Sequence, residues 1–505
     1  MTSVKISPSL FLKSLVVTGV VLLFLCGTLR PCNAYDLTGR VKEFTLENGL
    51  KVLIVERHTG PTVSLYISHP AGAADEENGH TGTAHILEHM MFKGTETIGT
   101  KNFEEEKRIL RMIHDVGNAL DTELMKGDSA DRQKIEDLRK QLETLQREAG
   151  KWSIPSEIDR LYTEKGGGDL NASTGQDLTT YHVSLPSNRI ELWARIESDR
   201  MTNPVFREFY SERDVVMEER KQTVESNPGR KLMEQFLAAA FMVHPYRRPV
   251  LGWAPDMRFL NIDYTKEFFR TYYAPNNTTI VIVGDVSPDR VMKIIKRYFG
   301  RIPSQKIPVR RVTEEPPQNG ERRVKLISDA APRLIIGYHK PTLPSFDDCV
   351  FDVIDTILSG GRTSRLFKAL VEKGIAVGVN TANGFPGARY PNLFVIFAEP
   401  VSPHTCGKLE EIIYKELDIL KKEPAKPKEL EKAKNKLKTD LLRGLSTNSG
   451  LAGMLSYYGA VAGDWRYITT FLDLLERVTP EDVMAAAKKY FEPRNRTVAE
   501  LVRDE

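Results

Sequence analysis

Two histidines and a glutamate stand at a spacing that can build a metal site. His85 and His89 are four residues apart, and Glu88 lies between them. On a helix, positions i, i+3 and i+4 share one face, with neighbouring Cβ atoms about 6 Å apart. Both imidazoles could then reach one Zn²⁺ at about 2.0–2.1 Å, while Glu88 faces a water on the metal. The spacing predicts a zinc site in which Glu88 acts as the catalytic base.

The order His-x-x-Glu-His is the reverse of the His-Glu-x-x-His order in many zinc hydrolases. A catalytic zinc keeps one open position for water and lowers the pKa of that water to about 7. A nearby carboxylate can then take the proton as the water attacks a carbonyl. The same pattern arises by chance in core helices that carry two histidines. A catalytic site needs a third protein ligand, which another part of the chain must supply.

Two predicted helices contain histidines or acidic residues at helical spacing. The first contains the two histidines. Thr81 or Thr83 could cap its start, and Gly94 could end it. A later helix is expected at 206–224. It would place Glu212 and Glu219 seven residues apart, on one face and two turns from each other.

The composition is that of a globular protein large enough for two or three domains, with 505 residues, 41% hydrophobic and 28% charged. The net charge of +3 falls to zero without residues 1–34, so neither nucleic acid nor an anionic membrane is expected as a main partner. Those residues combine a basic start, an apolar run and small residues before Tyr35, which predicts a signal peptide. The mature chain would be periplasmic or otherwise exported, with no stable membrane span. An uncleaved anchor is the alternative.

The rest of the pattern predicts an α+β protein built from two similar halves. Strands are expected at 43–47, 51–55, 63–68, 170–174, 179–185 and 278–285, then at 323–327, 334–339, 392–398 and 497–502. Helices are expected at 188–201, 266–273, 288–299, 347–358, 406–422 and 427–442. The similar order in the two parts indicates a duplicated unit.

Two segments interrupt this pattern. Residues 101–165 contain two highly charged helices, which predict a helical hairpin inserted into the first half. Residues 301–321 are rich in Pro, Arg and Glu and predict a linker between domains at 35–300 and 322–505. Cys349 and Cys406 could form a disulfide in an oxidising compartment, or they could be two buried thiols.

Taken together, these residues resemble the pitrilysin (insulinase) family of zinc metallopeptidases. The resemblance is to its short bacterial members, which are similar to the mitochondrial processing peptidase. It covers most of residues 40–490. It is carried by His85-Ile-Leu-Glu88-His89, Leu170-Asn171-Ala172, Glu212 to Glu219, His244 to Trp253, Tyr273 to Asp285, and Ser364 to Phe367.

The resemblance implies one Zn²⁺ per chain, with Glu219 as the third ligand and Glu212 as its supporting carboxylate. Glu218 is the neighbouring alternative, but it is out of register with Glu212. The family also holds extended peptides on an edge strand through backbone hydrogen bonds. Asn171 and Ala172 match that strand, and they could equally be ordinary strand residues. The implied architecture is two α/β sandwich halves, each a mixed or antiparallel sheet packed by helices, joined by a linker and closed like a clamshell.

One departure from the family concerns the second half. Many members place an arginine and a tyrosine over the scissile carbonyl, and Val371 and Val377 occupy the matching positions here. One donor aimed at the developing oxyanion is worth about 2.7–4 kcal/mol. We therefore expect this chain to be the zinc-bearing subunit of an endopeptidase that acts on peptides or unfolded polypeptides in the cell envelope. A homologous zinc-less subunit would complete the enzyme by supplying Arg and Tyr. The alternative is a noncatalytic scaffold or a peptide-binding subunit.

Overall fold

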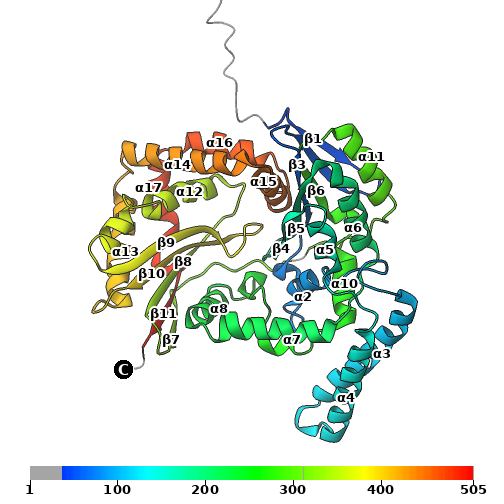
Figure 1. Cartoon of the computed structure of the whole chain (residues 1–505). Helices are drawn as coiled ribbons and strands as arrows, with labels where there is room; N and C mark the ends of the chain where they lie inside the picture. Colours follow the sequence, from blue (N-terminus) through cyan, green and yellow to red (C-terminus); the bar gives the residue numbers. More distant parts are fainter. Residues whose placement is uncertain (1–36, 311, 504–505) are drawn as a thin grey trace, which may run out of the picture. The chain divides into compact units, whose positions relative to one another are not determined.

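The computed structural model describes residues 37–310 and 312–503, and the part from Val41 onward forms one compact unit (Figure 1). The signal peptide expected at 1–34 lies outside the described residues. Within the described ranges, no helix is both long enough and apolar enough to cross a membrane.

The first sheet has six strands in the order β1-β2-β6-β3-β5-β4. Strands β2 and β6 are parallel, and all other neighbours are antiparallel. The sheet ends at β4, so one side of this strand pairs with no other strand in the described part of the chain. The six strands are β1 (Val41–Thr45), β2 (Lys51–Glu56), β3 (Thr62–His69), β4 (Gly168–Thr174), β5 (Thr179–Pro186) and β6 (Thr279–Gly284).

The second sheet repeats this topology in the order β7-β11-β8-β10-β9. Its single parallel pair is β7 with β11, which corresponds to β2 with β6 in the first sheet. Beyond this pair, all neighbouring strands in the second sheet are antiparallel, as they are in the first. The duplicated α+β fold expected from the sequence is therefore confirmed. Its strands are β7 (Arg322–Ile327), β8 (Arg333–Lys340), β9 (Ala376–Phe385), β10 (Asn392–Pro400) and β11 (Arg496–Val502).

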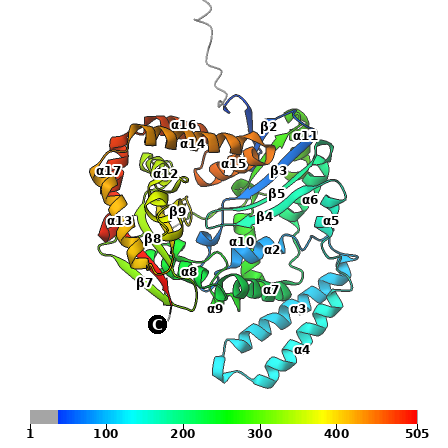
Figure 2. The same ribbon diagram turned by 60° about the vertical axis from the view of Figure 1, so that its left-hand side comes forward.

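The helices cover both sheets, and each half lends one helix to the other (Figure 2). Helix α8 packs on β7, β8 and β11 of the second sheet, and α15 packs on β3 and β6 of the first. The helices before the second sheet are α2 (Thr83–Met90), α3 (Phe103–Leu124), α4 (Arg132–Ala149), α5 (Glu157–Thr163), α6 (Ile190–Thr202), α7 (Phe209–Arg220), α8 (Pro228–Ala240), α9 (Ala254–Met257), α10 (Ile262–Tyr272) and α11 (Pro288–Phe299). The later ones are α12 (Phe346–Ser359), α13 (Cys406–Lys422), α14 (Pro427–Ser446), α15 (Asn448–Val461), α16 (Tyr467–Arg477) and α17 (Pro480–Tyr490).

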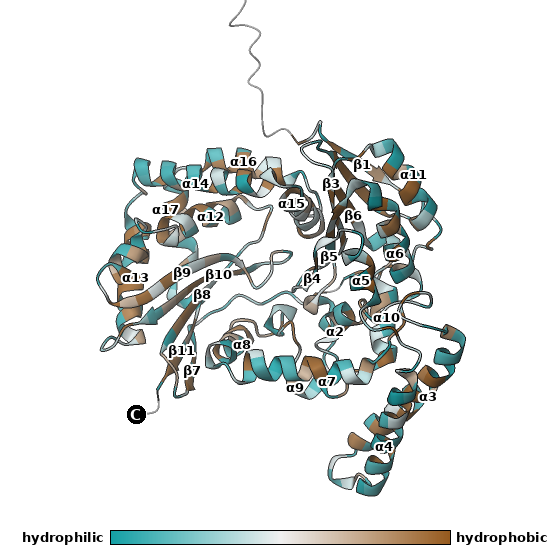
Figure 3. Ribbon diagram, viewed as in Figure 1, coloured by the Kyte–Doolittle hydropathy of each residue, from teal (hydrophilic) through white to brown (hydrophobic). Residues whose placement is uncertain are grey.

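Hydrophobic residues gather in the central strands, such as β3 and β6 (Figure 3). One core lies between the first sheet and helices α6 and α11, and includes Leu65, Ile282 and Trp193. A second core joins α2, α3, α7 and α10, where Ile86, Leu87 and Met90 are fully or almost fully buried. The helix that carries the two histidines is thus fixed by its opposite, apolar face.

The charged segment forms the expected helical hairpin of α3 and α4, which projects from the rest of the compact unit (Figures 1 and 2). Its base is tightly docked. Buried ion pairs join Glu106 of α3 to Arg207 and Asp121 of α3 to Arg213 of α7, with shortest N–O distances of 2.6 and 2.8 Å. Gly117 lets the Tyr210 ring approach the α3 backbone. The hairpin therefore braces α7.

Several local expectations differ from the structure. Strand β4 begins at Gly168, two residues before the strand expected at 170–174. Helix α8 and strand β9 were not expected from the sequence, and a π-helix covers Phe367–Val371. Cys349 and Cys406 are free and buried, so they are two thiols and not a disulfide. Between Phe299 and Arg322 the described residues form no helix or strand, and the domain boundaries stay a prediction.

We predict that Gly117→Ala destabilises the docking of α3 on α7. The new Cβ would lie 2.0 Å from Cζ of Tyr210, so the ring or the helix must shift. Overpacking of this kind costs about 1–3 kcal/mol, which thermal unfolding would show as a lower Tm.

The matched control is Gly459→Ala in α15, where the added Cβ has no heavy atom within 4 Å. Alanine is favoured over glycine inside helices by about 0.5–1 kcal/mol, so Tm should stay equal or rise. An equal loss of Tm in both variants would contradict the tight contact at Gly117.

Candidate metal centre

A buried carboxyl group, and not a threonine, binds the backbone N–H groups at the start of helix α2. Neither Thr81 nor Thr83 caps the helix. Its N-cap is Gly82 at φ +94°, a left-handed conformation that favours glycine. The Glu76 carboxyl accepts hydrogen bonds from the backbone N–H of Gly82 at 2.9 Å and of Ala84 at 2.7 Å. Burial raises the pKa of Glu76 to about 8, even though both backbone bonds oppose that rise. The start of α2 is therefore set by a buried side chain from the segment just before the helix.

The other end of α2 rests on a buried arginine. Arg200 Nε donates to the Met91 carbonyl at 2.8 Å, and its Nη1 pairs with Glu197 at 2.7 Å. The guanidinium also lies 5.0 Å from the Phe92 ring centroid and 4.9 Å from that of Tyr181. These contacts satisfy a carbonyl at the helix terminus and hold the residues after His89 in place.

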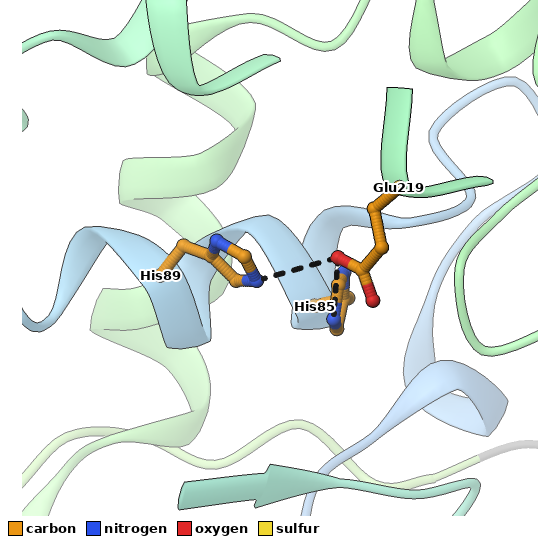
Figure 4. A group of neighbouring side chains, drawn as sticks. All are labelled: His85, His89 and Glu219. Atoms are coloured by element: carbon orange, nitrogen blue, oxygen red, sulfur yellow. Dashed lines mark ion pairs between the residues drawn. The ribbon is translucent and has the colours of Figure 1, made fainter. Parts of the chain in front are cut away.

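His85, His89 and Glu219 come together at the face of α2 that turns toward α7 (Figure 4). Glu219 Oε2 lies 3.9 Å from Nε2 of His85 and 3.8 Å from Nε2 of His89. All three ligand atoms lie within 4.8 Å of one another. Two atoms that each lie about 2.1 Å from one ion can be at most about 4.2 Å apart, so both measured pairs are compatible with a shared Zn²⁺. Two imidazoles and one carboxylate also form the donor set of a catalytic zinc site.

Glu212 contacts His89 at Nδ1, the ring nitrogen that does not face Glu219. Its Oε1 lies 2.9 Å from His89 Nδ1, and its Oε2 lies 2.6 Å from Lys93 Nζ. Burial alone would raise the pKa of Glu212, but the hydrogen bonds from His89 and Lys93 outweigh it and lower this pKa to about 2. An ionised Glu212 accepts a hydrogen bond from the Nδ1–H group of His89, which leaves the lone pair of His89 Nε2 free for a metal.

His85 is the more buried of the two imidazoles. Burial, assisted by the neighbouring His89, lowers the pKa of His85 to about 4, so its ring is neutral near pH 7. The neutral ring is the form that binds a metal. Its Nδ1 is buried and has no hydrogen-bond partner among the described residues, while Nε2 faces Glu219.

Glu88 lies on the same helix but contacts the first sheet. Its Oε2 accepts a hydrogen bond of 2.5 Å from the Thr174 hydroxyl, at the end of β4. Burial raises the pKa of Glu88, and the bond from Thr174 partly opposes this effect. The bond from Thr174 fixes the orientation of this carboxyl group beside the metal centre. The edge strand β4 therefore ends beside the metal centre.

The remaining residues indicated by the sequence lie on edge strands or close to them. Asn171 is exposed and Ala172 half-buried on β4, opposite His182 and Tyr181 of β5. In the second half, Val377 lies on the edge strand β9 with 67% of its surface exposed. Val371 is half-buried and ends the π-helix Phe367–Val371. Neither valine offers a polar donor.

Sequence reasoning missed Glu76, Lys93, Thr174 and Arg200. Lys93 stands four residues after His89, so helical spacing could have indicated it. The other three reach α2 from a loop, a strand and a distant helix, and no local pattern in the sequence marks them.

Comparison with known proteins identifies relatives of this chain. It matches the family model "Insulinase (Peptidase family M16)" at residues 51–121 and 151–253, and the model "Peptidase M16 inactive domain" at residues 260–437. Together they cover more than half of the chain. Residues 122–150, around the tip of the hairpin, match neither model, and this gap is narrower than the insertion expected at 101–165.

Individual relatives agree with this assignment. The zinc protease PqqE of Helicobacter pylori is 25% identical over 468 residues, covering 90% of this chain and 91% of its own. The crystal structure of a protease from Helicobacter pylori has a TM-score of 0.77 at 24% identity and covers 92% of this chain and 99% of its own. The periplasmic protease PqqL from Escherichia coli has a TM-score of 0.68 at 16% identity, over 92% of this chain and 47% of its own. This chain belongs to the insulinase, or M16, family of peptidases, the pitrilysin family that its motifs resemble.

Proposed function

We propose that this chain is a zinc-dependent endopeptidase that hydrolyses peptides or unfolded polypeptides. The observation that carries the proposal is the convergence of His85, His89 and Glu219, with their ligand atoms within 4.8 Å of one another and Glu88 on the same helix. The naming of PqqE as a zinc protease supports it. The family model with "inactive" in its name covers residues 260–437, which lie outside this centre.

In this proposal His85, His89 and Glu219 hold one Zn²⁺, which supplies Lewis-acid catalysis and a water of lowered pKa. Glu88 accepts the proton of the attacking water and later passes it to the leaving amine. Thr174 keeps the Glu88 carboxylate oriented through its hydrogen bond of 2.5 Å. Glu212 keeps the tautomer of His89 that presents Nε2.

The substrate would bind along β4. The outer edge of this strand is free of other described strands, so an extended peptide can add to the sheet through its backbone. Because β4 ends at Thr174, which contacts Glu88, such a peptide would run directly to the metal centre. Asn171 and Ala172 would pair with its backbone, which gives affinity with little dependence on side chains.

We also propose that catalysis needs a homologous subunit without zinc ligands. Val371 and Val377 cannot stabilise an oxyanion, so the partner would supply the Arg and Tyr that this chain lacks. The match covers 47% of PqqL, so more than half of that longer chain has no counterpart in this one. The basic and apolar start of the chain, together with the periplasmic location in the PqqL description, supports a place in the cell envelope.

We predict that Glu88→Gln keeps the metal and the fold but lowers the rate of peptide cleavage by about 10²–10⁴-fold, because glutamine cannot accept a proton. The measurement compares zinc content and cleavage of an unstructured peptide in wild type and variant. Loss of zinc in the variant would instead make Glu88 a ligand, and unchanged cleavage would remove it from catalysis.

A second prediction concerns zinc affinity. Glu219→Ala should abolish stoichiometric zinc at micromolar metal, and Glu212→Gln should weaken binding by about 10–100-fold because His89 loses its orienting carboxylate. A competition titration with a chelator measures both. Glu218→Ala is the matched control, since this neighbouring exposed carboxylate pairs only with Lys221 and Gln222 among the described residues. If only Glu218→Ala weakened zinc binding, Glu218 and not Glu219 would be the third zinc ligand.

A third prediction tests the partner. The purified wild-type chain alone should hold zinc yet cleave peptide slowly. The double variant Val371→Arg/Val377→Tyr should cleave about 10-fold faster than wild type, or more. The reason is that one oxyanion donor alone is worth about 10²–10³-fold in an optimised site. Zinc content serves as the control for intact structure. Rapid cleavage by the wild-type chain alone would show that no partner is needed.

A further inference from the structure

The segment His244 to Trp253 supplies no metal ligand, yet its end contacts the start of α2 and the end of α7. Helix α2 carries His85 and His89, and α7 carries Glu219. The segment leads into the short helix α9, which packs on α7 (Figure 2). It therefore lies where it can fix one ligand-bearing helix relative to the other.

Gly252 packs directly against the start of α2. Its φ is +81°, and Gly82, the N-cap of α2, has φ +94°. A Cβ atom on Gly252 would lie 2.3 Å from the Thr81 carbonyl oxygen and 2.6 Å from the Gly82 nitrogen, so only glycine allows this approach of two backbones. Beside it, the Trp253 N–H donates to the Thr81 hydroxyl at 2.8 Å. The first residues of α2 are thus fixed to Gly252.

Arg220 joins the same glycine to α7. It follows Glu219 and is the last residue of that helix. Its Nη1 donates to the Gly252 carbonyl at 2.7 Å, and Nη1 and Nη2 donate to the two carboxylate oxygens of Glu234 in α8 at 2.7 and 2.9 Å. Arg220 is only 6% exposed, and a two-bond pair of this kind holds a guanidinium in one orientation. The residue next to Glu219 is therefore anchored to the segment that holds α2.

The helix changes form directly after this arginine. Residues Lys221–Glu225 form a π-helix, whose hydrogen bonds join residues five apart instead of four. Because Glu219 lies in the last turn of α7, no regular α-helical turn follows it to fix its direction. Arg220 Nε also lies 3.8 Å from Glu225 Oε1 of the π-helix. Arg220 thus holds the point at which α7 ends.

These contacts form a short path between the ligands. It runs from Glu219 to Arg220, across the bond to Gly252, and through the backbone contact to Gly82, three residues before His85. The Glu219 carboxylate lies 3.9 Å from His85 Nε2, close to the upper limit of about 4.2 Å for two ligands of one Zn²⁺. Moving α7 away by about 0.5 Å would exceed this limit unless Glu219 changed its rotamer.

We propose that Arg220 and Gly252 are positioning residues of the metal centre, which together set the distance between Glu219 and the two histidines. They keep the ligands arranged in the metal-free chain, so zinc binds without reorganising α7. The inference rests on the zinc site of the proposed function and extends it to the segment His244 to Trp253.

The first test compares Arg220→Lys with Arg365→Lys. Arg365 forms the same two-bond pair with Glu429 in the second half, and its side chain is 14% exposed, against 7% for Arg220. Lysine keeps the charge but cannot reproduce the planar fork of donors. The Kd for Zn²⁺, from competition with a chelator, should rise about 10–100-fold in Arg220→Lys and change less than about twofold in Arg365→Lys.

The second test compares Gly252→Ala with Gly463→Ala. The two glycines have nearly equal φ angles of +81° and +78°, so the backbone strain of alanine is matched. A Cβ atom at Gly463 would have no heavy atom within 4 Å, whereas at Gly252 it meets the start of α2. The Kd for Zn²⁺ should rise about tenfold or more in Gly252→Ala only. If either Gly252→Ala or Arg220→Lys fails to fold, the other decides the proposal.

A double variant separates positioning from a general loss of stability. In the Glu219→Ala chain, titrated at higher zinc, adding Arg220→Lys should change the remaining affinity by less than about twofold, because the ligand that Arg220 places is absent. A merely structural role would lower affinity in both backgrounds. The Tm of the metal-free chains records the stability of each variant.

Equal zinc affinity in wild type and Arg220→Lys, equal losses in Arg220→Lys and Arg365→Lys, or an undiminished effect in the Glu219→Ala chain would each overturn the proposal. A wild-type chain that binds zinc through Arg220 but cleaves no peptide would leave this inference standing and remove the peptidase function alone. A chain that cleaves peptide with a zinc affinity independent of Arg220 has the opposite meaning.

Discussion

The metal centre depends on holding α7 against α2. The two histidines share one short helix, but Glu219 arrives from another helix far along the chain. Two buried ion pairs, Glu106 with Arg207 and Asp121 with Arg213, fix α7 and the residues before it through the base of α3. Removing one partner of such a pair leaves a buried charge and costs about 3–5 kcal/mol. The separations of 3.8 and 3.9 Å at Glu219 are thus maintained by contacts outside the centre.

Part of the candidate site was predicted from local spacing in the sequence, and the assignment of Glu219 as the third ligand came from the family resemblance. A step of four residues put His85 and His89 on one face, and a step of seven put Glu212 and Glu219 on another. Alternation and turn residues located most strands of both sheets, including the edge strand β4. The equal order of elements indicated two similar halves, which the matching strand orders confirm.

Features that depend on contacts between elements, or between a helix and the segment before it, could not be predicted in this way. The caps expected from Thr81 and Thr83 are absent because the buried Glu76 carboxyl binds the same backbone groups. Arg200 supports the end of α2 from α6, and its position has no periodic signature. The exchange of α8 and α15 between the halves also escaped prediction, because an amphipathic helix does not reveal which sheet it covers.

That exchange affects how the chain can be made. The first sheet is complete once β6 ends at Gly284, yet α15, which packs on β3 and β6, ends only at Val461. At about 5–20 residues per second, a ribosome needs on the order of 10–35 s to add the intervening segment. During this interval the surface around Tyr66, later covered by Ser449 and Gly453, is without its helix. The N-terminal half therefore cannot finish folding as it is synthesised and must wait for nearly the whole chain.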